Sequence, residues 1–337
     1  MKLVLKAGQI KIPHFAHFKN SQCELLFSEG ESATHLLGKQ QLYQLFTKLH
    51  LEPILEPYLP QIRQRPDILI SKDGRQFAIE FQCSKIPFSL FQQRTNGYVA
   101  ANITPIWIVH TPNDTFKMRG LTKISINHTN AQYMQTYKKQ RFLITYDVRS
   151  EMFYYVSNLI HVHRLQYFGV VQALPLFSQQ FPFLIPQRMT KPIFQQVYLR
   201  FIKYRDAYIH HRLLLSKKGV NDRFFRAVYE LELTSSRLPN FIGISVRNTH
   251  LFEVFCVEWQ VQLFYFMKCH QLTPQSMNIK AIPYFLQWAN LEQTEQARDA
   301  IEHYLAILKQ LNVKNVHENV SQKKIYEILY NELVAIG

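Results

Sequence analysis

The sequence predicts an α+β fold with a mixed middle region and a helical C-terminal domain. In the first third of the chain, a helical pattern is followed by three strand-like segments, a second helix and a further strand. The pair Asp73-Gly74 separates the second and third of these strands, which is typical of a hairpin. Helical periodicity then dominates from about residue 191. A mixed order that begins with a hairpin favours α+β over a doubly wound fold.

Each expected element has its own local signal. Leucines near helical spacing mark the first helix, and Glu31 and Ser32 lie where its start is expected. β-Branched and aromatic residues mark the strands, and Pro87 suits the first turn of the second helix. The expected elements are a helix over 31–50, strands over 53–59, 65–72 and 76–84, a helix over 87–102 and a strand over 103–110.

Composition and turn signals divide the chain into four regions. The segment 1–30 is short and polar. A turn at 111–114 closes the first α+β unit. We therefore expect a core over 31–111. Residues 112–190 form a mixed, basic middle region that ends in a stretch containing several prolines, and the helical domain is expected over 191–337.

The overall charge favours a polyanionic partner. The chain has 39 Lys and Arg residues against 24 Asp and Glu, which gives a net charge of +15. Each phosphate that Lys or Arg neutralises releases a counterion, so binding to a polyanion is favoured. On charge alone, nucleic acid and an anionic membrane surface both stay open.

The sequence predicts neither a transmembrane segment nor disulfides. The most apolar long stretch, 251–267, is interrupted by Glu253 and Glu258 and is shorter than the roughly 20 residues of a membrane helix. A buried helix or a strand pair is expected there. The N-terminus has no apolar signal-peptide core. Widely separated cysteines without a CxxC pair indicate reduced thiols and a cytoplasmic location; they are Cys23, Cys83, Cys256 and Cys269.

The spacing of acidic residues around the predicted hairpin indicates a metal site. Asp67 is followed after twelve residues by Glu80, Phe81 and Gln82. Residues two apart on a strand share a face, so Glu80 and Gln82 point together while Phe81 points to the opposite face. A hairpin in register places Asp67 beside Glu80. Two such carboxylates repel each other unless a cation bridges them, and Mg²⁺ prefers oxygen ligands of this kind.

The same residues also allow a purely structural interpretation. Asp67 could cap a strand, and Glu80 and Gln82 could be solvent-facing residues of an amphipathic strand. On the second helix, Arg94 and Tyr98 lie four residues apart and share one face. They could approach a DNA phosphate, support the acidic strand, or belong to an ordinary amphipathic helix.

A basic stretch in the C-terminal half is the best candidate for a DNA path. Aromatic residues interleave with it, and they could stack on exposed bases, although their spacing favours a helix core stripe. The aromatic residues are Tyr198, Phe201, Tyr204 and Tyr208. The candidate DNA-binding residues are Arg200, Lys203, Arg205, Arg212, Lys217 and Lys218.

Several segments together resemble one known family. They are IPHFAH at 12–17, the helix start with Glu31, Ser32, His35 and Lys39, RPDILI at 65–70, AIEFQCS at 78–84, Gln93, Arg94 and Tyr98, IWIV at 106–109, and 238–260. On these segments the chain resembles the competence protein CoiA family. The resemblance spans nearly the whole chain and is most specific over 12–109.

The resemblance implies a restriction-endonuclease-like core of the PD-(D/E)XK type. Asp67 and Glu80 match the acidic residues of the motif, and Gln82 occupies the position that lysine usually holds. The resemblance further implies Mg²⁺ or Mn²⁺ bound by Asp67, Glu80 and the Phe81 carbonyl, with Glu31 completing the site. Lys85 could supply the missing cation or be a solvated surface residue.

The implied function is metal-dependent phosphodiester hydrolysis of incoming DNA in natural transformation. The alternative is a catalytically weak or inactive nuclease-like protein that binds DNA and assists the loading of recombination proteins. The expected partners are DNA, single-stranded or double-stranded, and recombination or competence proteins at the DNA-uptake machinery. Relatives usually have a CxxC knuckle upstream of HFAH and a later cysteine, whereas this chain has no such knuckle and only His14, His17 and Cys23 are left. Structural zinc needs four ligands, so residues 1–30 are expected to be the remnant of a zinc ribbon without zinc.

Overall fold

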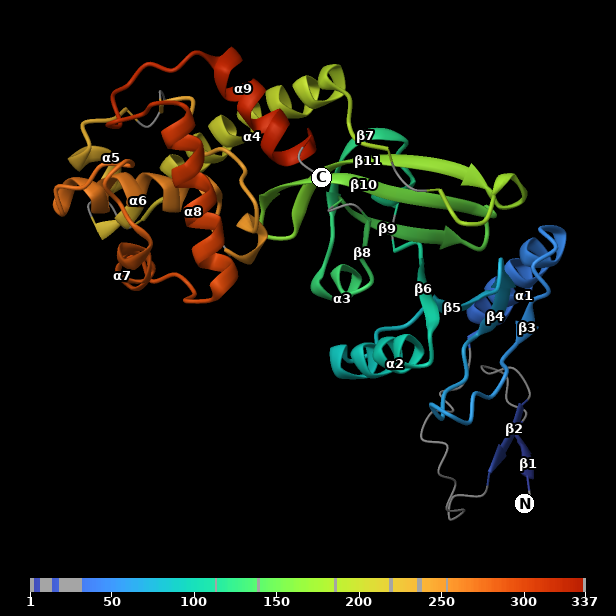
Figure 1. The fold of residues 1–337 in the computed structure, drawn as a ribbon. Helices are drawn as coiled ribbons and strands as arrows, with labels where there is room; N and C mark the ends of the chain where they lie inside the picture. Colours follow the sequence, from blue (N-terminus) through green and yellow to red (C-terminus); the bar gives the residue numbers. More distant parts are fainter. Residues whose placement is uncertain are drawn as a thin grey trace.

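A computed structural model gives the fold of the chain (Figure 1). It describes residues 3–6, 14–17, 32–112, 114–137, 140–184, 187–217, 221–234, 238–252 and 254–335. Glu31 and Lys218, both predicted site residues, and Cys23 lie outside these ranges. In the N-terminal part, β1 (Leu3–Lys6) pairs antiparallel with β2 (His14–His17).

One mixed sheet forms the centre of the fold. Its strands are β3 (Ile54–Leu55), β4 (Ile68–Lys72), β5 (Arg75–Gln82), β6 (Ile103–His110), β7 (Gly120–Ser125), β8 (Gln135–Tyr137), β9 (Gln140–Asp147), β10 (Met152–His163) and β11 (Gln166–Pro175). The strand order is β3-β4-β5-β6-β9-β10-β11-β7, with β8 beside β9. The pairs β5–β6 and β6–β9 are parallel and the other pairs are antiparallel. The α+β class is therefore confirmed.

Helices cover the sheet near its beginning and dominate the C-terminal half, as predicted. Figure 1 shows α4 to α9 gathered beside the β7–β11–β10 end of the sheet. The α-helices are α1 (Ala33–Lys48), α2 (Phe88–Ala100), α3 (His128–Ala131), α4 (Lys191–Leu215), α5 (Arg223–Glu230), α6 (Cys256–Cys269), α7 (Ile282–Trp288), α8 (Glu295–Gln310) and α9 (Gln322–Tyr330). Short helical turns are η1 (Asp114–Lys117), η2 (Leu176–Ser178), η4 (Thr249–Leu251), η5 (Ile279–Ala281) and η6 (Asn331–Ala335).

The predicted hairpin forms around Asp73 and Gly74. Both residues have positive φ, 51° and 73°, as a two-residue type I′ turn requires. The strands pair with Ile68 opposite Ile79, and the register holds to the turn. The preceding prediction, a strand over 53–59, was wrong for most of its length. The prolines of this segment cannot donate to a ladder, and only the two residues of β3 pair with β4.

Helix α1 packs directly on β5. Ser32 caps the helix by accepting a hydrogen bond from the His35 amide at 3.2 Å. The approach is closest at Gly38, where an added Cβ would lie 2.1 Å from Cε1 of the Phe81 ring. Glycine is therefore required here by space and not by backbone conformation.

Replacing Gly38 by alanine is expected to destabilise the protein by about 1–3 kcal/mol, the usual range for overpacking. This cost exceeds the gain of up to about 1 kcal/mol from helix propensity, because Phe81 is held in the core. Gly97→Ala in α2 is the matched control, since its Cβ meets only the amide end of Gln64 at 2.2 Å, which can move. Denaturant unfolding of both variants measures the difference, and equal stabilities would contradict the packing argument.

The sheet does not end where the first α+β unit was expected to close. Val109 and His110 at the end of β6 pair with Thr145 and Tyr146 of β9. The middle region therefore continues the same sheet, to which it contributes β7, β8, β9, β10 and β11. The domain boundaries themselves stay predictions.

Strands β10 and β11 contribute to more than one hydrophobic core. Phe153 and Tyr155 of β10 pack in the core under α1. Further along these strands, Ile160, Val162 and Phe168 belong to the core of the C-terminal helices. The long strands thus join the sheet to the helical region by shared packing.

The apolar stretch over 251–267 forms most of α6, so the expected buried element is a helix. Most residues of α6 are buried, including Trp259 and Glu258. Among the described residues, no helix combines the length and apolar character that a membrane span requires.

Candidate active site

Asp67 and Glu80 meet across the hairpin, as the register predicted. Asp67 immediately precedes β4, and continuing the Ile68–Ile79 register places it opposite Glu80. The Asp67 carboxylate reaches across to β5, where its Oδ2 accepts a hydrogen bond from the Phe81 amide at 2.8 Å. The two acidic groups are close enough for Asp67 to raise the pKa of Glu80.

The Glu80 carboxyl group is buried between the sheet and α2. Glu80 is 2% exposed. Its Oε1 accepts hydrogen bonds from the Arg94 guanidinium at 2.5 Å and from the Tyr98 hydroxyl. Burial raises the pKa of Glu80 to about 7; the Arg94 charge opposes this rise, and the Asp67 charge adds to it. Glu80 is thus a buried acid that exchanges a proton near neutral pH.

Arg94 is fixed by acceptors from three parts of the chain. Besides Glu80, the guanidinium donates to the Arg65 carbonyl at 3.0 Å and to the Tyr98 hydroxyl at 3.3 Å, and it lies 5.9 Å from the centre of the Trp107 ring. Burial works against its charge, but the Glu80 carboxylate holds the pKa of Arg94 above its ordinary value. Of the interpretations left open by the sequence, support of the acidic strand agrees with these contacts.

Helix α1 adds two basic residues on the other side of Asp67. His35 Nε2 lies 3.3 Å from Asp67 Oδ2, and the His35 ring stacks on Phe81 with centroids 6.1 Å apart. Lys39, one turn later, is 4% exposed and donates to the Glu56 carboxylate. The Glu56 amide in turn donates to the Asp67 carbonyl at 3.0 Å. These two residues were not predicted to belong to the site, although their four-residue spacing already put them on one helix face.

The side chains of Gln82 and Lys85 do not bind the carboxylates of Asp67 and Glu80 within the described part of the chain. The Gln82 amide donates to the carbonyl and hydroxyl oxygens of Ser84 at 3.0 and 3.2 Å. Lys85 is exposed. Within the described ranges, neither side chain makes a hydrogen bond to Asp67 or Glu80. The Phe81 ring is buried on the opposite face, as predicted, while a metal-binding role for its carbonyl stays a prediction.

In each carboxylate of the pair, the protein donors that the structure describes bind only one of the two oxygens. The hydrogen bonds to Asp67 end on Oδ2, and those to Glu80 end on Oε1. Among the residues that the structure describes, Asp67 Oδ1 and Glu80 Oε2 have no hydrogen-bond partner. The same part of the chain contains no group of three or more His, Cys, Asp and Glu residues suited to a metal ion. Two carboxylate oxygens are nevertheless a donor set that Mg²⁺ uses together with water and substrate phosphates.

Two of the predicted DNA-binding residues are bound by neighbouring segments of the helical region. The assignment to a surface is corrected for Arg205, which is buried, whereas the Arg212 side chain is 31% exposed. Arg205 is 4% exposed and donates to the Ile242 carbonyl at 2.8 Å. Arg212 forms ion pairs with Asp222 at 3.2 Å and with Glu258 at 3.1 Å. Both side chains hold α4 against neighbouring segments, so they do not offer a free charge to DNA.

The other described basic residues of α4 and its end are at the surface. Arg200 is exposed and donates to the Leu121 carbonyl at 3.0 Å. Lys203 and Lys217 are exposed. Their role in DNA binding stays a prediction. The interleaved aromatic residues Tyr198, Phe201, Tyr204 and Tyr208 belong to or pack against the core of the helical region, as their spacing favoured.

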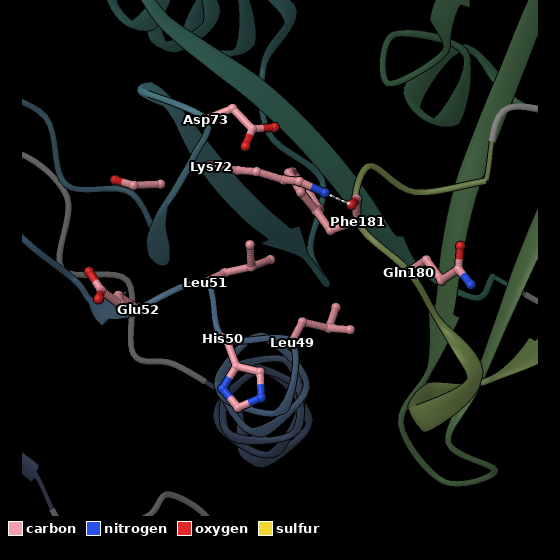
Figure 2. Close-up of a pocket in the computed structure, with 9 residues that line it drawn as sticks. Leu49, His50, Leu51, Glu52, Lys72, Asp73, Gln180 and Phe181 are labelled. Carbon is pink, nitrogen blue, oxygen red and sulfur yellow. Dashed lines mark hydrogen bonds between the residues drawn. The ribbon is translucent and has the colours of Figure 1, made fainter.

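A cleft of about 640 Å³ lies away from these carboxylates, at the turn end of β4. Figure 2 shows Leu49 and Leu51 pointing into it, and Lys72 reaching across to the Phe181 carbonyl. The cleft is lined by Leu49, His50, Leu51, Glu52, Ser71, Lys72, Asp73, Gln180 and Phe181. No predicted site residue is among them, so the hollow and the acidic chemistry are separate features.

Comparison with known proteins gives a consistent set of matches. Three family models match successive parts of the chain: Competence protein CoiA, N-terminal domain, at 1–26; its nuclease-like domain at 31–189; and its C-terminal domain at 195–328. Competence protein CoiA of Bacillus subtilis (strain 168) is 31% identical over 267 residues, which are 79% of this chain and 69% of that protein. No solved structure matches.

Proposed function

Because the chain belongs to the competence protein CoiA family and carries its nuclease-like domain, we propose that it is a metal-dependent deoxyribonuclease acting on incoming DNA during transformation. The order α1, β4–β5 hairpin, α2, β6 supports a restriction-endonuclease-like core of the PD-(D/E)XK type. Mg²⁺ or Mn²⁺ would be the cofactor, and Asp67, Glu80 and the Phe81 carbonyl its ligands.

The single observation that carries this proposal is that the hairpin brings two carboxylates together, each held by protein donors through one of its oxygens. Two acidic groups this close are costly unless a cation lies between them. Their proximity at the open end of the hairpin therefore has a physical reason if they share a divalent ion.

The chain's own residues would act by positioning. The Phe81 amide and His35 fix Asp67 through Oδ2, and Arg94 and Tyr98 fix Glu80 through Oε1. Preorganised groups of this kind lower the cost of reaching the reactive geometry. A bound divalent ion would supply activation of water and stabilisation of charge on the scissile phosphate.

A second candidate function is DNA binding without cleavage, in support of recombination-protein loading. Two observations favour it. Arg94 already neutralises Glu80 at 2.5 Å, and the Gln82 amide turns toward Ser84. Strand β5 thus provides no cation next to the two carboxylates within the described part of the chain.

A cleavage and binding assay separates these functions. The purified chain is incubated with labelled single-stranded and double-stranded DNA in Mn²⁺, Mg²⁺ or EDTA. Cleavage that requires the metal supports the nuclease. Salt-sensitive binding without cleavage in any metal supports the second function. Neither cleavage nor binding would leave a protein-interaction scaffold at the uptake machinery and would overturn both proposals.

Charge reversal on α4 and just beyond it is expected to weaken DNA binding. In the triple variant Arg200→Glu, Lys203→Glu, Lys217→Glu, phosphates are repelled where the wild type attracts them, so affinity should fall with little dependence on base sequence. The salt dependence should also flatten, by roughly 0.7–0.9 for each phosphate that is no longer neutralised. In the matched control, the charge is reversed at three exposed lysines elsewhere in the chain, Lys280, Lys309 and Lys314. Equally weakened binding in the two triple variants would mean that only net charge matters.

A further inference from the structure

An exposed aromatic ring lies at the start of α2. Phe88 is the first residue of the helix and is 56% exposed. Its ring stacks on Phe91 with centroids 6.1 Å apart and an angle of 23° between the planes. A lone exposed apolar side chain is common in proteins, so the significance of Phe88 depends on its support and its neighbours.

The ring beneath Phe88 is held rigidly. Phe91 contacts the buried rings of Trp107 at 4.9 Å and Tyr133 at 5.4 Å, and the Trp107 indole donates to the Thr95 hydroxyl at 3.1 Å. Phe88 is thus the outermost ring of an array that continues into the core. A ring that is already ordered loses little conformational entropy when a second ring stacks on it.

Phe88 lies on the same helix as the residue that holds Glu80. Phe88 and Arg94 are six residues apart, or about 9 Å along the axis at 1.5 Å per residue, and Arg94 donates to Glu80. An exposed cation, Lys85, precedes Phe88 by three residues. An aromatic side chain and a basic side chain, both exposed, therefore lie within four residues of each other where the chain leads from β5 into α2, the helix whose Arg94 holds Glu80.

We propose that Phe88 is a stacking platform for an unpaired base of single-stranded DNA, with Lys85 contacting a neighbouring phosphate, on the approach to Asp67 and Glu80. The inference depends on the proposed function only in taking DNA as the partner. A paired base keeps both faces covered within the duplex, whereas an unpaired base offers a face to the ring. Stacking of this kind accepts every base, which suits a protein that meets DNA of any sequence.

The test is binding of a labelled oligonucleotide in EDTA, so that cleavage plays no part. Phe88→Ala is expected to lower affinity for single-stranded DNA by roughly 5- to 100-fold, from about 1–3 kcal/mol per stacked base and 1.4 kcal/mol per tenfold change. Affinity for a blunt duplex should change less than twofold. Phe88→Trp should retain binding, and Phe88→Leu, which keeps the apolar surface without the ring, should lose it. Lys85→Ala should reduce the salt slope by about 0.7.

The control is Tyr284→Ala in α7, where an exposed aromatic residue is removed from the helical region. It should bind as the wild type does, and unchanged thermal unfolding of each variant excludes loss of the fold. Unchanged single-strand affinity in Phe88→Ala, equal weakening on both DNA forms, or full binding by Phe88→Leu would overturn the platform. Because the assay contains no metal, a weakened Phe88→Ala supports the platform even if the wild type never cleaves DNA.

Discussion

Replacing Asp67 or Glu80 by alanine is expected to reduce metal-dependent DNA cleavage by more than about 100-fold. Each change removes one of the two carboxylates that the hairpin brings together. Even groups that only orient a metal ligand are typically worth 10–100-fold in metal affinity or activity, so loss of a ligand should cost more. Cleavage in Mn²⁺ and in Mg²⁺, with Mn²⁺ affinity followed separately by electron paramagnetic resonance, measures both effects.

Isosteric variants separate loss of a ligand from loss of the fold. Asp67→Asn keeps an oxygen that can accept from the Phe81 amide, so its structure should be retained while its metal affinity falls. Asp73→Asn is the matched control, because Asp73 is an exposed carboxylate at the tip of the same hairpin. It should cleave as the wild type does. If Asp67→Ala and Glu80→Ala both retained full activity, the metal site would not be at this hairpin.

Replacing Arg94 by alanine is expected to lower the free energy of unfolding by about 3 kcal/mol at pH 8. The reason is that Glu80, 2% exposed, would have either to bury its charge without its guanidinium partner or to take up a proton at pH 8. Breaking a buried ion pair by removing one partner typically costs about 3–5 kcal/mol. The lower end of this energy range applies here, because the Arg94 side chain is 27% exposed and solvent partly screens its charge.

The loss of stability caused by Arg94→Ala should increase with pH. The pKa of Glu80 is already raised to about 7 from 4.5, so its folded form binds more protons than its unfolded form. The stability associated with this group is highest below about pH 4.5 and is lost as pH rises through the folded pKa. Removing Arg94 raises that pKa further. The variant should therefore be closest to the wild type near pH 5 and fall behind it increasingly toward pH 8.

Denaturant unfolding at several pH values tests this expectation. The double variant Arg94→Ala, Glu80→Gln contains no buried charge at this position, so its stability should be nearly independent of pH over the same range. A pH-independent loss in the single variant would mean that the packing of Arg94 against Trp107, and not its charge, is what stabilises α2.

The parts of the site that sequence could predict are those governed by local rules. The Asp-Gly turn specifies a two-residue hairpin, and hairpin register then follows from the count of residues in each strand. This is why Asp67 was expected beside Glu80, and why Phe81 was expected on the opposite face. Helices α1 and α2 were likewise predicted from periodicity and from the residues at their starts.

The parts that sequence could not predict depend on contacts between distant segments. Arg205 and Arg212 lie in a helix whose charges are typical of a solvated face, yet the Ile242 carbonyl and the Glu258 carboxylate bind them. The parallel pairing of β6 with β9 leaves no local signal, since parallel strands are joined by long connections. The orientation of Gln82 toward Ser84 is also a detail of the following turn, which the alternation of a strand does not specify.

The two-residue turn at Asp73 and Gly74 restricts the insertions and deletions that this part of the gene can accept. Because successive strand residues alternate between faces, inserting or deleting one residue between 68 and 79 would exchange the positions of Glu80 and Phe81. The carboxylate would then point toward α1, and the phenyl ring would take its place beside α2. Over evolutionary time, this hairpin should tolerate many amino-acid substitutions but almost no insertions or deletions. Insertions would be confined to the exposed connections between elements, where the spacing of the acidic pair is untouched.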